Sequence, residues 1–182
     1  LRCLAMSIRP LVRLSRNAAL LSCLAAAGAC HAPQKPKDTC QVTQPNGVVA
    51  GSTERQDGSY GNAQVSVGPF GLWPNGTVIF KPGGPGFVTR EGALGMKFGW
   101  TRGVSGALHI TGRRLDAPAA PLQSEVGDDT GDGFEASYLI FPSPGCWEVT
   151  ATVGNRSDAS LTFVTRIEQV GAGPAWHRDS TP

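Results

Sequence analysis

Apolar and polar residues alternate in short runs along most of the chain. In the clearest run, residues 94–100, every second residue is large and apolar: Leu94, Met96, Phe98 and Trp100. Because successive side chains of a strand point to opposite faces, these four side chains are expected on one buried face. Beyond the N-terminal segment, no stretch shows the 3.6-residue period of a helix. The pattern predicts strands over residues 64–67, 77–81, 86–89, 94–100, 107–113, 134–141, 146–153 and 161–167.

Turn-forming residues separate these runs. In Trp73-Pro74-Asn75-Gly76, proline suits the first central position of a turn, asparagine the second, and glycine the left-handed residue that follows. Residues 44–47 repeat this chemistry, residues 81–86 form a Pro/Gly loop between two strands, and residues 154–158 close the final hairpin. Seven to eight short strands with such turns predict an all-β fold, an immunoglobulin-like (Ig-like) two-sheet sandwich, with a small barrel as the alternative.

The composition is that of a folded chain and excludes one class of partner. Of the 182 residues, 40% are hydrophobic and only 16% are charged, so the chain can build a core. The formal net charge is +2, but four of the 16 basic residues lie in residues 1–29, which hold no acidic residue. The 12 basic residues that follow are outnumbered by 14 acidic ones. This slightly acidic remainder predicts no nucleic-acid partner.

The first residues have the composition of an export signal. Met6 is the expected start, with Leu1 as the alternative, and arginines precede an apolar stretch over residues 18–27. That stretch is shorter than the roughly 20 residues that span a bilayer, which favours a cleaved signal peptide over residues 1–29. Its last residues, Ala27-Gly28-Ala29-Cys30, resemble the bacterial lipobox, in which the cysteine is lipidated and becomes the mature N-terminus.

The lipobox resemblance implies a lipid anchor on Cys30 that holds the protein to a membrane, although Ala27 stands where leucine is commonest. Ordinary signal cleavage near Ala29 or Ala32 is one alternative, and a retained helix is the other. A Pro- and Lys-rich stretch after Cys30 has the composition of a flexible tether. The predicted organisation is a signal peptide at 1–29, a tether at 30–40, the sandwich at 41–170 and a disordered tail at 171–182.

Two of the five cysteines are left for a disulfide. Cys3 precedes Met6, Cys23 leaves with the signal peptide, and Cys30 is the expected lipid site. Cys40 and Cys146 remain, and in an oxidising compartment they are expected to be bonded, with two free thiols as the alternative. The antibody pattern is absent, because Cys40 precedes all the strands. No CxxC motif or paired histidine points to a metal-binding or catalytic cysteine.

Two loops contain residues that can bind ions. Asp128, Thr130, Asp132 and Gly133 lie at offsets similar to those of a calcium-binding EF-hand loop. The twelfth position is Leu139, where such a loop needs glutamate, and no helices flank it, so a solvated acidic loop is favoured over calcium. The loop over residues 81–86 could hold a phosphate on its backbone amides, but it lacks the GK[ST] ending and a following helix. Neither loop is taken as a cofactor or metal site.

Histidine, methionine, serine and tryptophan side chains are the remaining candidates for metal-binding, catalytic or ligand-binding groups. His109 alternates with Leu108 and Ile110, which places it on the opposite, solvent face of its strand. Met96 aligns with the core face of its run and is expected in the core rather than at a copper ion. No GxSxG motif occurs, and no catalytic residue is predicted. Trp73, Trp100 and Trp147 could form a platform on which sugar rings stack. Core packing is the favoured alternative for Trp100 and Trp147.

Several stretches resemble bacterial exported lipoproteins that carry an Ig-like domain. The resemblance is carried by Phe141-Pro142-Ser143-Pro144-Gly145-Cys146-Trp147-Glu148-Val149-Thr150, followed by Leu161-Thr162-Phe163-Val164. Leu72-Trp73-Pro74-Asn75-Gly76 and residues 80–87 add to it, so that it covers residues 40–168. The resemblance implies export and a sandwich fold, and it implies no activity.

The function favoured at this point is a non-catalytic module of the bacterial cell envelope, with a binding or structural role. Its expected partners are the membrane, through the lipid anchor, and a protein or a glycan of the envelope. A periplasmic or secreted soluble protein is the alternative location. An exported protease inhibitor is the second functional hypothesis and would present an apolar loop tip such as Phe87. A hydrolase or metal-binding protein is the third hypothesis. A flat aromatic patch on the surface would favour the non-catalytic envelope module.

Overall fold

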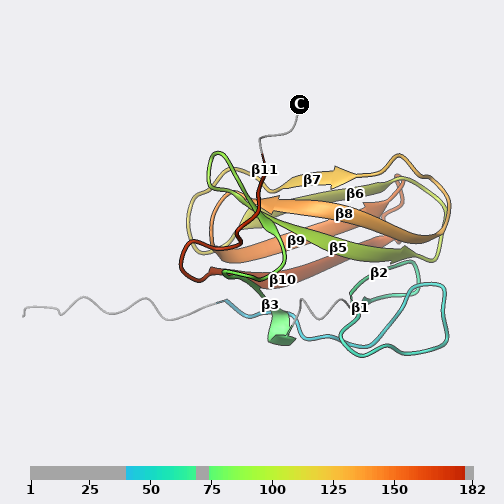
Figure 1. Cartoon of the computed structure of the whole chain (residues 1–182). Helices are drawn as coiled ribbons and strands as arrows, with labels where there is room; N and C mark the ends of the chain where they lie inside the picture. Colours follow the sequence, from blue (N-terminus) through green and yellow to red (C-terminus); the bar gives the residue numbers. More distant parts are fainter. Residues whose placement is uncertain (1–39, 69–73, 179–182) are drawn as a thin grey trace, which may run out of the picture. The chain divides into compact units, whose positions relative to one another are not determined.

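The computed structural model describes residues 40–68 and 74–178 (Figure 1). The expected signal peptide, the expected lipidation site at Cys30, the expected tether up to residue 39 and Trp73 lie outside these described residues. The described part is all-β, with a single 3-10 turn, η1, at Pro74–Gly76. Its strands are β1 (Tyr60–Gly61), β2 (Val65–Val67), β3 (Thr77–Phe80), β4 (Phe87–Thr89), β5 (Leu94–Arg102), β6 (Leu108–Arg114), β7 (Gln123–Val126), β8 (Gly133–Phe141), β9 (Gly145–Val153), β10 (Ser160–Gln169) and β11 (His177–Arg178).

The strands form two sheets (Figure 1). In the seven-stranded sheet, β5 pairs with β8 along one side and with both β2 and β4 along the other. Strand β7 extends this sheet beyond β8, β1 extends it beyond β2, and β11 extends it beyond β4. The four-stranded sheet has the order β3-β10-β9-β6, with β3 parallel to β10.

The strand connections are those of an Ig-like sandwich. The order β2-β5-β8-β7 in one sheet follows the A-B-E-D order of Ig domains, and β10-β9-β6 in the other follows G-F-C. The chain therefore crosses between the sheets from β5 to β6, from β6 to β7 and from β8 to β9. The predicted all-β, Ig-like two-sheet sandwich is confirmed.

The core lies between the two sheets and contains the apolar face expected from the alternation in β5. Leu94, Met96, Phe98 and Trp100 are all buried. Trp100 lies 6.2 Å, between ring centroids, from Phe163 of the opposite sheet. Its indole nitrogen donates to Ser137 Oγ at 2.9 Å, so the buried polar group is satisfied.

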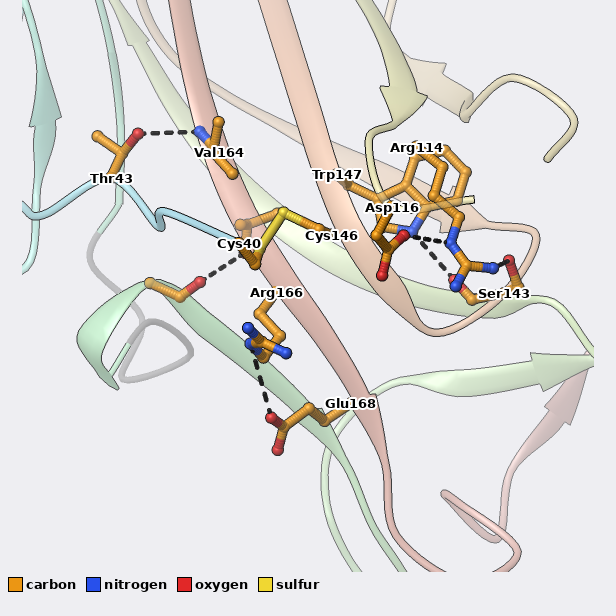
Figure 2. Close-up of a disulfide and its surroundings, with 12 residues drawn as sticks. Cys40, Thr43, Arg114, Asp116, Ser143, Cys146, Trp147, Val164, Arg166 and Glu168 are labelled. Carbon is orange, nitrogen blue, oxygen red and sulfur yellow. Dashed lines mark hydrogen bonds and ion pairs between the residues drawn. A yellow bond between two sulfur atoms is a disulfide. The ribbon is translucent and has the colours of Figure 1, made fainter. Parts of the chain in front are cut away.

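A disulfide fixes the first described residues to the four-stranded sheet (Figure 2). Cys40 is bonded to Cys146, the second residue of β9, and their Cα atoms lie 5.5 Å apart. Thr43 continues along β10: its amide donates to the Val164 carbonyl at 2.8 Å, and the Val164 amide donates to Thr43 Oγ1 at 2.9 Å. The predicted pairing of Cys40 with Cys146 is thus present in the structure.

Two expectations about the extent of the sandwich need correction. The eight predicted strands are all present. The described residues contain three more strands, β1, β7 and β11, and each of them lies at an edge of the seven-stranded sheet. The tail expected to be disordered from residue 171 includes β11, which pairs in parallel with β4. The Val88 amide also donates to the Trp176 carbonyl at 3.0 Å. Backbone pairing with an open sheet edge orders the segment up to Arg178, which sequence polarity alone did not indicate.

Candidate functional site

Arg102, the last residue of β5, has a side chain that is fully buried. Its Nη1 donates to the carbonyl oxygens of Gly106 at 2.6 Å and Asp129 at 2.9 Å, and its Nη2 donates to Asp129 Oδ2 at 3.0 Å. Glu135 of β8 places Oε2 3.4 Å from Arg102 Nε, an ion pair without a hydrogen bond. The buried charge cluster is defined here as the buried Arg102 and Glu135 together with Asp129, whose exposed carboxylate pairs with Arg102 from the solvent side.

The two carboxyl groups of the buried charge cluster shift in opposite directions. Burial raises the pKa of Glu135 above its ordinary value, although the charge of Arg102 acts the other way. Both carboxylate oxygens of Glu135 are buried and have no hydrogen-bond partner. A hydrogen bond from the Gly131 amide, helped by Arg102, holds the pKa of the exposed Asp129 below its ordinary value. Glu135 is therefore the group of the cluster that resists ionisation.

The acidic loop over residues 128–133, a candidate calcium site in the sequence, contributes Asp129 to this cluster. Asp129 is engaged by Arg102 through both its backbone carbonyl and its side chain. The Thr130 carbonyl accepts the Gly106 amide at 2.8 Å, which joins the loop to the turn after β5. Within residues 40–68 and 74–178, no three His, Cys, Asp or Glu side chains come together in a way that could hold a metal ion. The loop is thus more than a solvated surface, because it closes the end of the sandwich over a buried cation.

The other sequence candidates lie where packing places them. His109 is exposed and Met96 is buried, as the alternation predicted. Trp100 and Trp147 are fully buried in the core, so neither ring is open for stacking on a sugar. The loop over residues 81–86 links β3 of one sheet to β4 of the other and closes with a Gly84 amide to Lys81 carbonyl bond at 2.9 Å.

An aromatic cluster that the sequence did not indicate lies on the outer side of the seven-stranded sheet. Phe87 of β4 is fully buried, although it faces away from the sandwich core, and its ring occupies the space above Gly95 where a Cβ would collide with it. Tyr138 of β8 contacts the Phe87 ring edge-to-face at 5.6 Å. Trp176 packs on the same ring at 5.1 Å with an interplanar angle of 73°. Although its ring is fixed in this way, Trp176 remains 54% exposed.

Two charged side chains complete the aromatic cluster, defined here as Phe87, Tyr138, Trp176, Arg178 and Glu125. The Arg178 guanidinium lies over the rings of Phe87 and Tyr138, at 5.2 Å and 5.4 Å from their centroids. Its Nη1 donates to Glu125 Oε2 of β7 at 2.8 Å. Both side chains are part-exposed. The cluster thus presents an immobilised indole beside a neutral pair of opposite charges.

The aromatic cluster could not be expected from the sequence as long as residues 171–182 were predicted to be a disordered tail. The signal that could have found it is Trp176 itself, a large aromatic residue next to a proline, glycine and alanine stretch in an otherwise polar segment. Phe87 was weighed only as an exposed loop tip, and its burial removes it as the apolar tip of an inhibitor.

A second surface feature lies on the outer face of the four-stranded sheet. A shallow depression of about 330 Å³ is lined by Thr111, Gly112, Arg113, Glu148 and Thr150. Arg113 Nε donates to Glu148 Oε1 at 2.8 Å across it. No aromatic ring lines this depression, so it offers hydroxyl and charged groups without a stacking surface.

None of the described residues belongs to a helix long and apolar enough to cross a membrane. A comparison with models of known protein families finds none that matches this chain, and a search of curated protein sequences finds no significant match.

Proposed function

We propose that this protein is a non-catalytic binding module of the bacterial cell envelope, held to the membrane by a lipid on Cys30, and that it binds through the aromatic cluster. The observation that carries this proposal is Trp176, which is 54% exposed while its ring packs edge-to-face on Phe87. An exposed aromatic ring that is already immobilised loses little conformational entropy on binding, which is why tryptophan is enriched at binding hot spots.

The surroundings of Trp176 support a binding role in preference to protease inhibition. An inhibitor would present Phe87 as an apolar loop tip, and that ring is buried under Arg178. The Cys40–Cys146 disulfide agrees with an oxidising, exported location.

The binding role is tested by photo-crosslinking in living cells. A photoreactive phenylalanine analogue at Ala175, the exposed neighbour of Trp176, leaves the tryptophan in place and should form an adduct with an envelope component when it is introduced into the full chain. The same analogue at Thr162, an exposed position on the four-stranded sheet, is the matched control and should form none. Absence of an adduct at position 175, or equal adducts at both positions, would show that the aromatic cluster is not a binding surface.

The lipid anchor is tested separately. Cys30→Ser should abolish metabolic labelling with palmitate and release the protein from the membrane fraction, because the acyl chains are lost. The Cys40–Cys146 disulfide should still form in this variant. Unchanged palmitate labelling would show that Cys30 does not carry the lipid.

A further inference from the structure

We infer that the ligand of the aromatic cluster is a neutral glycan, whose sugar ring stacks on Trp176 while its hydroxyl groups bond to Arg178 and Glu125. This inference rests on the proposed binding role and names the chemical class of the ligand. It is carried by the combination of a fixed indole and a hydrogen-bonding ion pair on the same side of the sheet.

The indole provides the apolar half of the site. Trp176 packs edge-to-face on Phe87, and Phe87 packs edge-to-face on Tyr138. The Phe87 ring also fills the space that a side chain at position 95 would occupy. Trp176 is 54% exposed and so leaves a small apolar surface open to solvent. A pyranose ring has one face lined with C–H groups, which matches such a surface in size and in lack of charge. The negative face of an aromatic ring attracts the weakly positive C–H groups.

The ion pair provides the polar half. The guanidinium of Arg178 is fixed over two rings, and one of its five N–H donors is used by Glu125. Part of each side chain reaches solvent, with 26% of Arg178 and 31% of Glu125 exposed. A sugar hydroxyl both donates and accepts, so one hydroxyl can accept from Arg178 while its neighbour donates to Glu125.

The charge balance selects a neutral ligand. An anionic ligand drawn to Arg178 would be repelled by the carboxylate of Glu125, which lies 2.8 Å from the guanidinium. A cationic ligand drawn to Glu125 would be repelled by Arg178. A protein partner is less well matched, because stable protein interfaces need a contiguous surface of about 800 Å² on each side. Among the described residues, the other large exposed ring is that of Phe134, which lies four residues from Tyr138 along β8, about 13 Å at strand spacing.

The test is titration of the full chain, in detergent, with a soluble hexasaccharide of β-1,4-linked N-acetylglucosamine as the neutral probe. The titration uses the Trp73→Phe variant, because Trp73 is the fourth tryptophan of the chain. Its tryptophan fluorescence should change saturably, because Trp100 and Trp147 are buried and Trp176 is exposed. Calorimetry should give the same dissociation constant. Trp176→Ala should weaken binding by roughly tenfold or more. Arg178→Lys keeps the positive charge but loses the planar fork, and it should weaken binding by a smaller factor.

Leu115→Ala is the matched control, because it removes another exposed apolar side chain, directly after β6 of the four-stranded sheet, and should leave the affinity unchanged. Equal affinity of Trp176→Ala and the wild-type chain, or no saturable binding at millimolar probe, would overturn the glycan inference. A protein adduct in the photo-crosslinking experiment together with no glycan binding would overturn this inference alone. Absence of any adduct at position 175 would instead remove the binding role on which it rests.

Discussion

Arg102 is a cation without access to water, and its environment makes a sharp prediction about stability. Arg102→Met would leave Glu135 buried without a counter-charge and would release Asp129 from its hydrogen bonds. Breaking a buried ion pair from one side costs about 3–5 kcal/mol, and we expect a loss of unfolding free energy in that range. Urea unfolding followed by fluorescence measures it.

Arg113→Met is the control for this substitution. Arg113 is 71% exposed and forms its ion pair with Glu148 on the surface, so its removal should change the unfolding free energy by less than about 1 kcal/mol. Equal losses from the two substitutions would show that the buried charge cluster does not hold the end of the sandwich.

Glu135 makes a prediction about pH, because burial raises its pKa while the opposing charge of Arg102 only partly compensates. The folded-state pKa lies above the unfolded value, so the stability that this carboxyl contributes is fully present below the unfolded pKa of about 4.3. It is lost as the pH rises through the folded pKa. Glu135→Gln stays neutral at every pH, so its unfolding free energy relative to that of the wild-type chain should rise from acidic to neutral pH, whatever constant loss follows from breaking the ion pair with Arg102.

The comparison is made by urea unfolding from acidic to neutral pH. The unfolding free energy of Glu135→Gln, relative to that of the wild-type chain, should decrease as the pH falls, because the wild-type carboxyl then becomes neutral as well. Asp129, with its lowered pKa, acts in the opposite direction in both chains. A variant that is less stable at neutral pH by an amount independent of pH would contradict the raised pKa of Glu135.

Among the elements, the N-terminal segment depends on its covalent bond to β9. The disulfide closes a loop with a sequence separation of 106, for which the chain-entropy model gives about 4–5 kcal/mol. Cys40→Ser should lower the unfolding free energy by up to that amount and should free Thr43 from β10. Cys30→Ser, which removes a cysteine outside this bond, is the control. A reductant should bring the wild-type chain to the stability of Cys40→Ser, and no difference between the oxidised chains would rule out the clamp.

Strands could be predicted from the sequence wherever one face of the strand is buried in the core. The alternation of Leu94, Met96, Phe98 and Trp100 is a direct record of that burial. Strand β7 was missed because its Gln-Ser-Glu-Val sequence pairs only at the edge of the sheet, where no apolar face is required. Strand β11 was missed for the same reason: its two residues, His177 and Arg178, are ordered by backbone pairing with β4.

The candidate site was less predictable than the fold, because it joins residues that are distant in the chain. Phe87, Tyr138 and Trp176 come together only when β11 pairs with β4 and β8 pairs with β5. Sequence patterning identified the core tryptophans, which the alternation determines, but not the exposed one, which depends on the pairing of short segments. The role of Asp129 was likewise hidden, because its partner Arg102 lies on a strand whose other inward positions are apolar.

For the molecule as a whole, the position of the disulfide determines how mechanical tension would pass through it. If the chain is pulled between its N-terminal segment and Trp176, the covalent path runs from Cys40 directly to Cys146 and then along β9 and β10. Residues 41–145, which include β1 to β8, lie in a side loop that carries no tension along its backbone.

Single-molecule pulling would show this division. Reducing the disulfide should lengthen the unfolded chain by the loop of sequence separation 106, about 350–380 Å when fully extended, and an unchanged length would contradict it. Phe87 and Tyr138, which support the ring of Trp176, both lie within the shielded loop. A protein tethered at one end and bound at Trp176 would therefore bear load through two paired strands, while the base of its binding surface stays unloaded along the backbone.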